Sequence, residues 1–172
     1  MNLATPYLGF TLPHPFVAGA SPLADDLDRL KRLEDAGIAA VVLRSLFEEQ
    51  IDQEALAHHG AIASHADSFA EATSYFPDPE GSVFGPDEYL EHLARVKASL
   101  GVPVIASLNG YTRAGWTDYA RQLEGAGADA LELNLYYVAT DGGEDAAEIE
   151  DRMVEIVRGV DASLFFPIPL QL

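Results

Sequence analysis

The stretch LEDAGIAAVVLR at residues 33–44 recurs almost register for register as LEGAGADALELN at residues 123–134. Each copy has the composition of a helix end, then a glycine, Gly37 or Gly127, and then an apolar run. Glycine readily adopts the left-handed backbone that ends many helices, and a continuous apolar run is typical of a buried parallel strand. The repeat therefore predicts a chain in which helices lead directly into buried strands.

Apolar residues at helical spacing extend this pattern in both directions along the chain. They predict four helices, which run through Leu27–Ala36, Leu90–Leu100, Trp116–Leu123 and Ile149–Val160. The second of these follows Pro86, and proline is favoured in the first turn of a helix because it has no N–H to leave unpaired there.

Further strands are expected beside those of the repeat. They are Phe16–Ala20 at the start, Val102–Ser107, and Phe166–Gln171 at the end, and the last two carry proline near their first position, where no ladder donor is lost. A small hairpin is expected over Thr5–Leu12, with Gly9 at its turn. Strands that alternate with helices indicate an α/β fold with a parallel sheet, either open and doubly wound or closed as a (β/α)₈ TIM-type barrel.

The length of 172 residues suits a single domain, which we expect to span residues 1–172 with an insertion at about 46–84 after the second strand of the array. A complete (β/α)₈ barrel typically needs ~250 residues. About five βα units fit into the sequence. We therefore expect either an open sheet or an incomplete TIM-type barrel.

The charge balance excludes several classes of function. Asp and Glu total 28 against 10 Lys and Arg, a formal charge of −18, and no basic cluster is present. Such a chain repels nucleic acid and anionic membranes. The absence of cysteine excludes disulfides, zinc knuckles and a thiol nucleophile. No secretory signal or long apolar run is visible, so a cytoplasmic protein is expected.

Polar residues lie where the predicted strands end, the edge at which parallel α/β folds bind their ligands. These candidate site residues are Ala20, Ser21, Arg44, Ser45, Ser107, Asn109, Asn134 and Gln171. All but Arg44 are neutral, which suits recognition of a planar polar ring better than metal binding. Any one of them could instead satisfy loop backbone, but their recurrence on successive strands favours a site.

Other motifs are weaker. The glycines of 125–127 end a helix, whereas a dinucleotide-binding fingerprint opens one. The histidines His58, His59 and His65 lie near acidic residues but match no established metal-site spacing, so an exposed insertion explains them as well and no metal is expected. The only acids near strand ends, such as Glu48 and Asp141, are expected to lie in loops.

At these residues the chain resembles the dihydroorotate dehydrogenase family of FMN-dependent (β/α)₈ barrels, particularly its dehydrogenase-like bacterial branch. The resemblance rests on YLG at 7–9, PFVAGAS at 15–21, VVLRSLFEEQ at 41–50, PVIASLNG at 103–110 and LELN at 131–134. It implies a flavoprotein oxidoreductase of pyrimidine biosynthesis that transfers hydride from a dihydropyrimidine, such as dihydroorotate, to FMN.

The resemblance also implies roles for individual residues. Ala20 and Ser21 would offer backbone contacts to the flavin, Asn134 a side-chain hydrogen bond, and Ser45 with Ser107 or Asn109 the pocket floor. Three positions depart from the usual pattern: Arg44 and Gln171 stand where lysines are usual, and Tyr137 stands where the Cys or Ser base is usual. Arg44 and Tyr137 are the candidate catalytic residues.

Two other functions are compatible with the sequence. The chain could be a non-catalytic binding or assembly module, including a homo-oligomer that completes the barrel, or a cofactor-independent barrel enzyme acting on a sugar phosphate. The last would need a carboxylate or lysine at a strand end.

Overall fold

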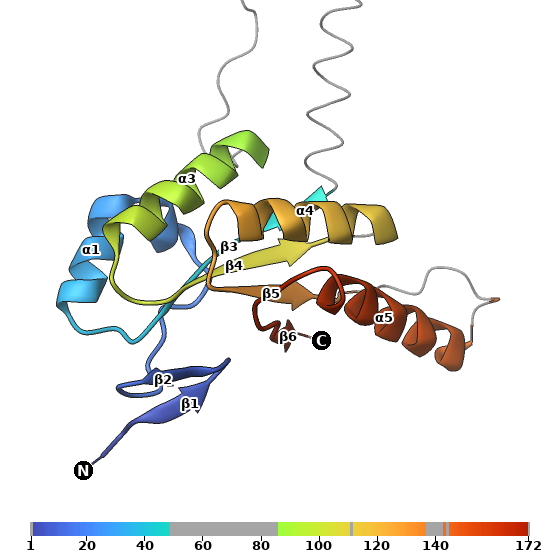
Figure 1. Ribbon diagram of the computed structural model, residues 1–172, viewed down its shortest axis with the longest axis horizontal. Coiled ribbons are helices and arrows are strands. Elements are labelled where there is room, and N and C mark those ends of the chain that lie inside the picture. The colour runs from blue at the N-terminus through green and yellow to red at the C-terminus, as the bar shows by residue number, and fades with distance from the viewer. Residues whose placement is uncertain (1, 49–85, 111, 137–142, 144, 172) are drawn as a thin grey trace, which may run out of the picture.

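The computed structural model describes residues 2–48, 86–110, 112–136, 143 and 145–171 (Figure 1). Its elements in chain order are β1 (Thr5–Tyr7), β2 (Phe10–Leu12), the 3₁₀ helix η1 (Pro22–Asp25), α1 (Leu27–Asp35), β3 (Val41–Phe47), α3 (Pro86–Ser99), β4 (Val104–Asn109), α4 (Arg113–Gly125), β5 (Ala130–Asn134), α5 (Ala146–Asp161) and β6 (Leu170–Gln171). All four predicted helices are confirmed. The predicted insertion at about 46–84 lies mostly outside the described residues.

The strands β3, β4, β5 and β6 form a parallel sheet in chain order, as expected for successive βα units. Neighbouring helices contact each other in the same order, α1 with α3, α3 with α4, and α4 with α5. Alternate strand residues such as Val104, Ala106 and Leu108 pack against buried helix residues such as Leu93 and Trp116 and form the main core. The predicted α/β fold is therefore confirmed.

The two copies of the repeat end their helices in the same way. Gly37 has φ 92° and Gly127 has φ 97°. The N–H of each glycine donates to the carbonyl of the residue three positions earlier, at 2.8 Å and 2.9 Å respectively. The next N–H in each copy bonds to a carbonyl five residues back, at 3.2 Å in both. This pair of bonds is the Schellman motif, in which glycine avoids the steric penalty of a left-handed backbone.

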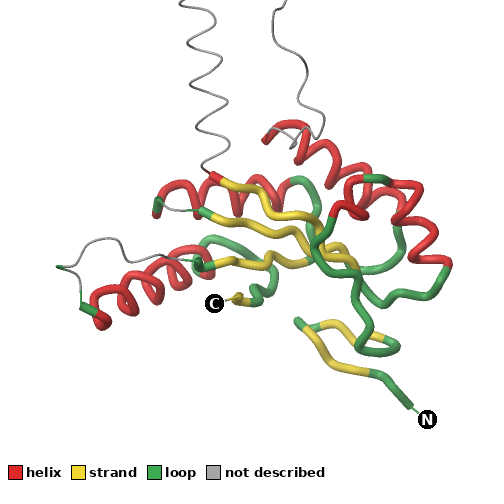
Figure 2. Tube along the Cα trace, turned by 180° about the vertical axis from the view of Figure 1, so that it is seen from behind, coloured by secondary structure: helices red, strands yellow, loops and turns green. Residues whose placement is uncertain are grey.

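The N-terminal hairpin is also confirmed. β1 pairs antiparallel with β2, and its turn uses Leu8 and Gly9, which have positive φ angles of 51° and 78°. The hairpin lies on the side of the sheet away from α3 and α4 (Figures 1 and 2). Leu12 of the hairpin is buried in a second, smaller core with Val42 and Ile105. This core lies on the sheet face opposite the helices, next to the residues that begin β3, β4 and β5.

The first predicted strand is shorter than expected. Phe16 and Ala18 form three backbone hydrogen bonds of 2.8 to 2.9 Å with residues 39–42. The pairing ends at Ala18. Gly19 and Ala20 are exposed and lead into η1. The prediction of a strand as far as Ala20 is therefore wrong by two residues, because the chain turns away to begin the 3₁₀ helix.

The last predicted strand is reduced to Leu170–Gln171. Pro167 and Pro169 have no N–H to donate, but their carbonyls accept from Leu131 at 3.3 Å and from Leu133 at 3.0 Å. From Pro167 onward the segment therefore runs beside β5, and its two prolines bond to β5 through their carbonyls alone. Only Leu170–Gln171 form a regular strand.

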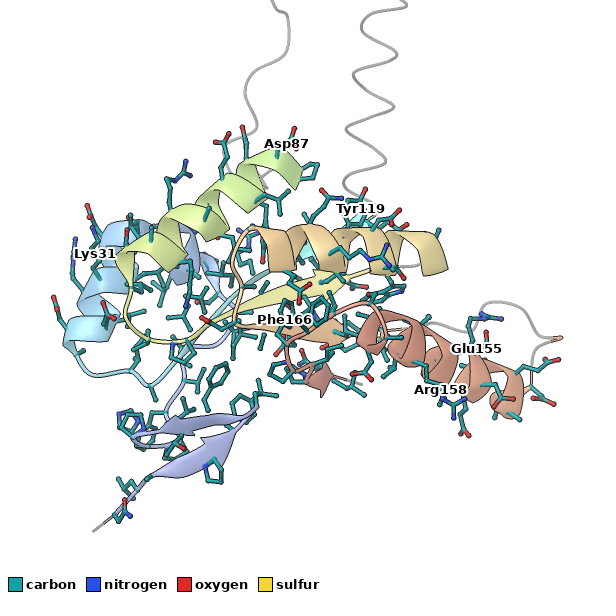
Figure 3. All side chains as sticks on the ribbon, viewed as in Figure 1. Lys31, Asp87, Tyr119, Glu155, Arg158 and Phe166 are labelled. Carbon is teal, nitrogen blue, oxygen red and sulfur yellow. The ribbon has the colours of Figure 1, made fainter. Side chains whose placement is uncertain are left out.

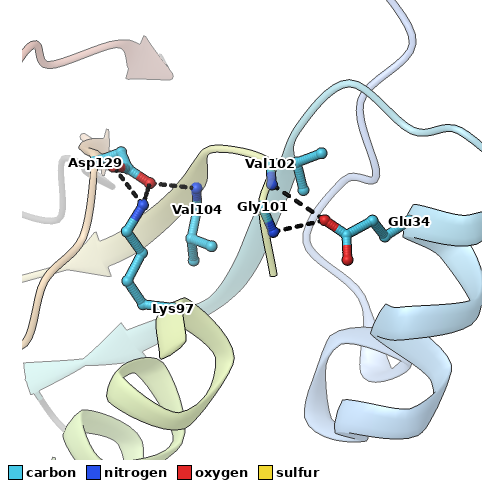
Figure 4. Close-up of polar contacts among 6 residues, drawn as sticks. All are labelled: Glu34, Lys97, Gly101, Val102, Val104 and Asp129. Atoms are coloured by element: carbon cyan, nitrogen blue, oxygen red, sulfur yellow. Dashed lines mark hydrogen bonds and ion pairs between the residues drawn. The ribbon is translucent and has the colours of Figure 1, made fainter. Parts of the chain in front are cut away.

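Two acidic side chains anchor the loops that lead into β4 (Figure 4). Glu34 accepts from the N–H groups of Gly101 and Val102, at 2.6 and 3.2 Å. Asp129 accepts from the N–H of Val104 at 2.8 Å and pairs with the ammonium of Lys97 at 2.6 Å. These contacts lie at the amino ends of the strands and fix where β4 and β5 enter the sheet.

The outer helix faces carry the charge. Lys31 and Asp87 point away from the sheet, whereas Phe166 packs against the main core (Figure 3). Among the described residues, no helix combines the length and apolar character needed to span a bilayer.

Candidate functional site

A bulge in β3 sets the orientation of Ser45. Val42 is opposite Ile105, and Ser45 is opposite Ser107. Between these two pairs β3 advances by three residues and β4 by two, so β3 contains one extra residue. Side chains on a regular strand alternate between faces, and without the extra residue Ser45 would face the helices. The bulge therefore returns Ser45 to the inner face, the one opposite the helices, where Val42 and Ser107 also lie.

Tyr89 of α3 supports this bulge. Its hydroxyl donates to the carbonyl of Arg44 at 2.7 Å and accepts from the N–H of Ser107 at 3.4 Å, so it links β3 and β4 where their regular pairing is interrupted. Tyr89 is 4% exposed, and burial raises the pKa of its phenol far above the ordinary value near 10. Nothing in the helical spacing of the sequence marked Tyr89 as more than a core residue.

Three of the candidate site residues converge on the inner face. The Nδ2 amide of Asn134 donates to Ser45 Oγ at 2.8 Å and to Ser107 Oγ at 2.9 Å, and the two hydroxyl oxygens lie 2.9 Å apart. Ser107 is fully buried and Asn134 is 3% exposed. The side chains of Ser45, Ser107 and Asn134, which come from β3, β4 and β5, therefore meet in one polar cluster.

Glu132 is a fourth member, which is not among the candidates expected from the sequence. Ser107 donates its hydroxyl hydrogen to Glu132 Oε1 at 3.0 Å. The alternation in LELN signalled this position, because Glu132 lies two residues before Asn134 on the same face of β5. We call Ser45, Ser107, Glu132 and Asn134 the inner polar cluster.

The side chain of Arg44 leaves this cluster and holds η1 instead. Its guanidinium Nη1 lies 2.8 Å from Asp25 Oδ2. η1 begins after Ser21, whose carbonyl accepts from the N–H of Ala24 at 2.9 Å, and the ring Nε2 of His92 bonds to the carbonyl of Ala24 at 2.7 Å. Arg44 is thus joined to the loop that carries Ala20 and Ser21 and not to Asn134.

The remaining candidates lie at the same edge of the sheet or outside the described residues. Asn109 pairs in register with Phe47 at the end of β4, and Gln171 pairs with Asn134 and is exposed. The other predicted positions, Tyr137, Asp141 and the histidines His58, His59 and His65, all lie outside the described part of the chain.

Glu48 is not in an exposed loop, contrary to the expectation from sequence. It is 5% exposed and accepts from the N–H of Thr112 at 2.9 Å and from the Thr112 hydroxyl. A Cβ atom on Gly115 would overlap its carboxylate. Thr112 caps the N-terminus of α4, where the helix dipole favours a negative charge, so the carboxylate is drawn inward.

One hydrogen-bond acceptor of the inner polar cluster is available to a ligand. The oxygen Oδ1 of Asn134 is buried and has no hydrogen-bond partner among the described residues. A buried acceptor without a partner is costly, and a donor from a ligand would satisfy it. Within the same residues, no group of three or more His, Asp or Glu side chains is arranged to hold a metal ion.

Comparison with known proteins gives no matching family model. The chain is 30% identical over 165 residues to the catalytic subunit of dihydroorotate dehydrogenase B (NAD(+)) from Methanocella arvoryzae, a match that covers 95% of this chain and 51% of that protein. The corresponding subunit from Thermoplasma volcanium is 27% identical over 169 residues, covering 95% of this chain and 53% of that protein. The chain thus spans about half the length of these relatives.

Solved structures show the fold. Dihydrodipicolinate synthase DapA-2 from Bacillus anthracis matches with a TM-score of 0.55 and 15% identity, over 90% of this chain and 44% of that one. A phosphonopyruvate hydrolase matches with a TM-score of 0.53 and 18% identity, over 91% and 47%. Both are TIM-barrel enzymes. The chain therefore has the fold of part of a TIM barrel and is a distant sequence relative of dihydroorotate dehydrogenase catalytic subunits.

Proposed function

We propose that this chain forms the flavin-facing part of an FMN-dependent oxidoreductase of the dihydroorotate dehydrogenase type. The enzyme would act in pyrimidine biosynthesis in the cytoplasm, and its substrate would be a dihydropyrimidine such as dihydroorotate. The observation that carries the proposal is the inner polar cluster, with the free buried acceptor of Asn134 at the carboxyl edge of a parallel sheet. The sequence similarity to dihydroorotate dehydrogenase catalytic subunits supports the choice of reaction.

Each candidate residue has a part in this proposal. Ser45 and Ser107 hold the amide of Asn134 in place, so that Asn134 can bond to the edge of a planar ring. Ala20 and Ser21 offer backbone groups from the loop that Arg44 anchors through Asp25, and Asn109 and Gln171 extend the polar edge. When bound, FMN would supply the hydride-accepting chemistry.

The proposed catalytic residues are Tyr137 and Arg44. Tyr137 would take the substrate proton, although a phenol with a pKa near ~10 is a weak base at neutral pH without a nearby cation. Arg44 presents a guanidinium group that pairs with Asp25. Its role would be to place positive charge at the rim, because it cannot act as a neutral amine.

A titration with FMN tests this function. We expect FMN fluorescence to be quenched on binding, and Asn134→Ala to weaken binding about tenfold, the effect of losing one good hydrogen bond to the ring. The exposed residue Glu91 offers a control, since Glu91→Ala should leave the affinity unchanged. Failure of the natural chain to bind FMN at millimolar concentration would exclude the proposal for this chain.

A second candidate function, a binding or assembly module that includes a homo-oligomer, is favoured by one observation. A groove of about 500 Å³ between α5 and β6 is lined mainly by apolar side chains, including Leu135, Met153, Val154 and Leu170, and Val154 and Leu170 are exposed. Sedimentation velocity separates the two functions. Assembly without flavin that Val154→Lys abolishes would favour the module.

A further inference from the structure

The hydrogen bonds of the inner polar cluster all run in one direction. Asn134 uses both amide hydrogens, one to Ser45 and one to Ser107. Ser107 has a single hydroxyl hydrogen, which it donates to Glu132. The bond between the two serines must then be donated by Ser45. The donated hydrogens therefore lead from Asn134 through the two serines to Glu132. Glu132 is the final acceptor in this series of hydrogen bonds.

This direction fixes which end of the Asn134 amide is free. With the amide turned over, Oδ1 would face Ser45 and Ser107, but the hydrogen of Ser107 is already given to Glu132. Only Ser45 could then donate, and both hydrogens of Nδ2 would lose their serine partners at a buried position. The carboxylate of Glu132 thus selects the orientation in which Oδ1 is free.

We infer that Glu132 is a positioning residue that makes Asn134 present an acceptor, so that the site selects a planar heterocycle with a ring N–H. This inference rests on the proposed function and adds the chemistry by which the ligand is recognised. Such an N–H occurs at N3 of oxidised flavin and in the ring of a pyrimidine such as orotate. Glu132 itself bonds to Ser107 and acts on the ligand only through Asn134.

The direction of the bonds can be tested without any ligand. The sequence has three asparagines, Asn2, Asn109 and Asn134, so selective ¹⁵N-asparagine labelling gives three pairs of side-chain amide signals. We expect the Asn134 pair to exchange with solvent at least about tenfold more slowly than the exposed Asn2 pair, because both of its hydrogens are buried and bonded.

Two variants of Glu132 separate acceptor chemistry from packing. Glu132→Gln keeps an acceptor oxygen and should retain slow exchange of the Asn134 pair. Glu132→Leu removes it, frees the hydrogen of Ser107 to compete for Asn134, and should speed exchange about tenfold. Glu91→Leu, on the exposed face of α3, is the matched control and should change nothing.

The ligand class is tested with two pairs of probes, FMN with 3-methyl-FMN and orotate with its ring N-methylated form. In the natural chain, N-methylation should weaken binding about fivefold to tenfold for the compound whose ring N–H bonds to Asn134. The affected pair therefore shows whether that compound is FMN or orotate. Glu132→Leu should erase that difference and Glu132→Gln should keep it. A purely steric effect of the methyl group would persist in Glu132→Leu and would overturn the inference.

Two further results distinguish this inference from the proposed function. Fast exchange of the Asn134 amide in the natural chain would overturn the inference even if FMN binds. A slow amide together with no binding of any of the four probes would overturn the proposed function and the assigned ligand class, while the direction of the bonds would stand.

Discussion

Tyr89 shows how one hydroxyl determines the backbone of a candidate site. Its bonds to the carbonyl of Arg44 and the N–H of Ser107 replace pairing that the bulge in β3 interrupts. The bulge in turn brings Ser45 to the face of Ser107. At the scale of single residues, the site therefore depends on a group in α3 that bonds to the backbone of β3 and β4.

Tyr89→Phe should destabilise the chain by about 1–2 kcal/mol, because the carbonyl of Arg44 loses its donor while the ring stays in the core. Urea denaturation followed by circular dichroism measures the change. Tyr136→Phe is the control, since Tyr136 is 56% exposed, and it should have no effect. Equal stability of Tyr89→Phe and the natural chain would mean that the phenol bonds contribute nothing.

The raised pKa of Tyr89 also predicts a loss of stability in alkali. Below pH ~10 the phenol is protonated in both states, so its contribution is complete. Above that value the unfolded chain releases a proton that the folded chain retains, and stability falls by up to about 1.4 kcal/mol per pH unit as pH rises toward the folded pKa. Denaturation at pH 9, 10 and 11 should show this slope, and Tyr89→Phe should lack it.

Helix α4 shows how an element is fitted to a carboxylate. Gly115 lies in its first turn, against Glu48, whereas Gly125 at its last residue has no atom within 4 Å of where a Cβ would lie. Alanine normally stabilises a helix relative to glycine by about 1 kcal/mol. The two glycines of one helix should therefore respond oppositely to the same substitution.

We expect Gly115→Ala to destabilise the chain by about 1–3 kcal/mol and Gly125→Ala to be neutral or mildly stabilising. Thermal denaturation of both variants measures the difference. In a Glu48→Ala background, the penalty for Gly115→Ala should disappear, because the overlapping carboxylate is gone. A penalty that persisted there would place the clash elsewhere.

At the level of elements, the sequence predicts the order of strands and helices well and their lengths less well. The helix ends at Gly37 and Gly127 are predictable, because glycine adopts the left-handed backbone of a helix end without steric cost. The sequence does not predict the end of the first strand at Ala18 or the bulge in β3, because both depend on contacts with residues far along the chain. Glu132 was visible in the alternation of LELN, whereas Glu48 was drawn inward by a helix N-terminus 64 residues away.

For the whole molecule, the main competition is between apolar surface and charge. The apolar groove between α5 and β6 favours association with other copies, while a net charge of −18 opposes it. Salt screens the repulsion and leaves the apolar attraction. The oligomeric state should therefore depend on ionic strength.

Self-association should strengthen about tenfold or more between 0.05 and 0.5 M sodium chloride, because screening removes repulsion between like-charged copies. Sedimentation equilibrium measures the dissociation constant. In Val154→Lys, the salt dependence should vanish along with the association. Association that weakened in salt would indicate ion pairs in place of the apolar groove.

The bonds of Glu34 and Asp129 have a consequence for how such a chain can diversify. They secure β4 and β5 at the amino end of the sheet, opposite the inner polar cluster. The side chains that fix the starts of these strands are therefore separate from those proposed to recognise the ligand. If the proposed function holds, substitutions in the inner polar cluster would alter which heterocycle binds while the contacts of Glu34 and Asp129 stay unchanged, so new selectivities would be accessible by small mutational steps.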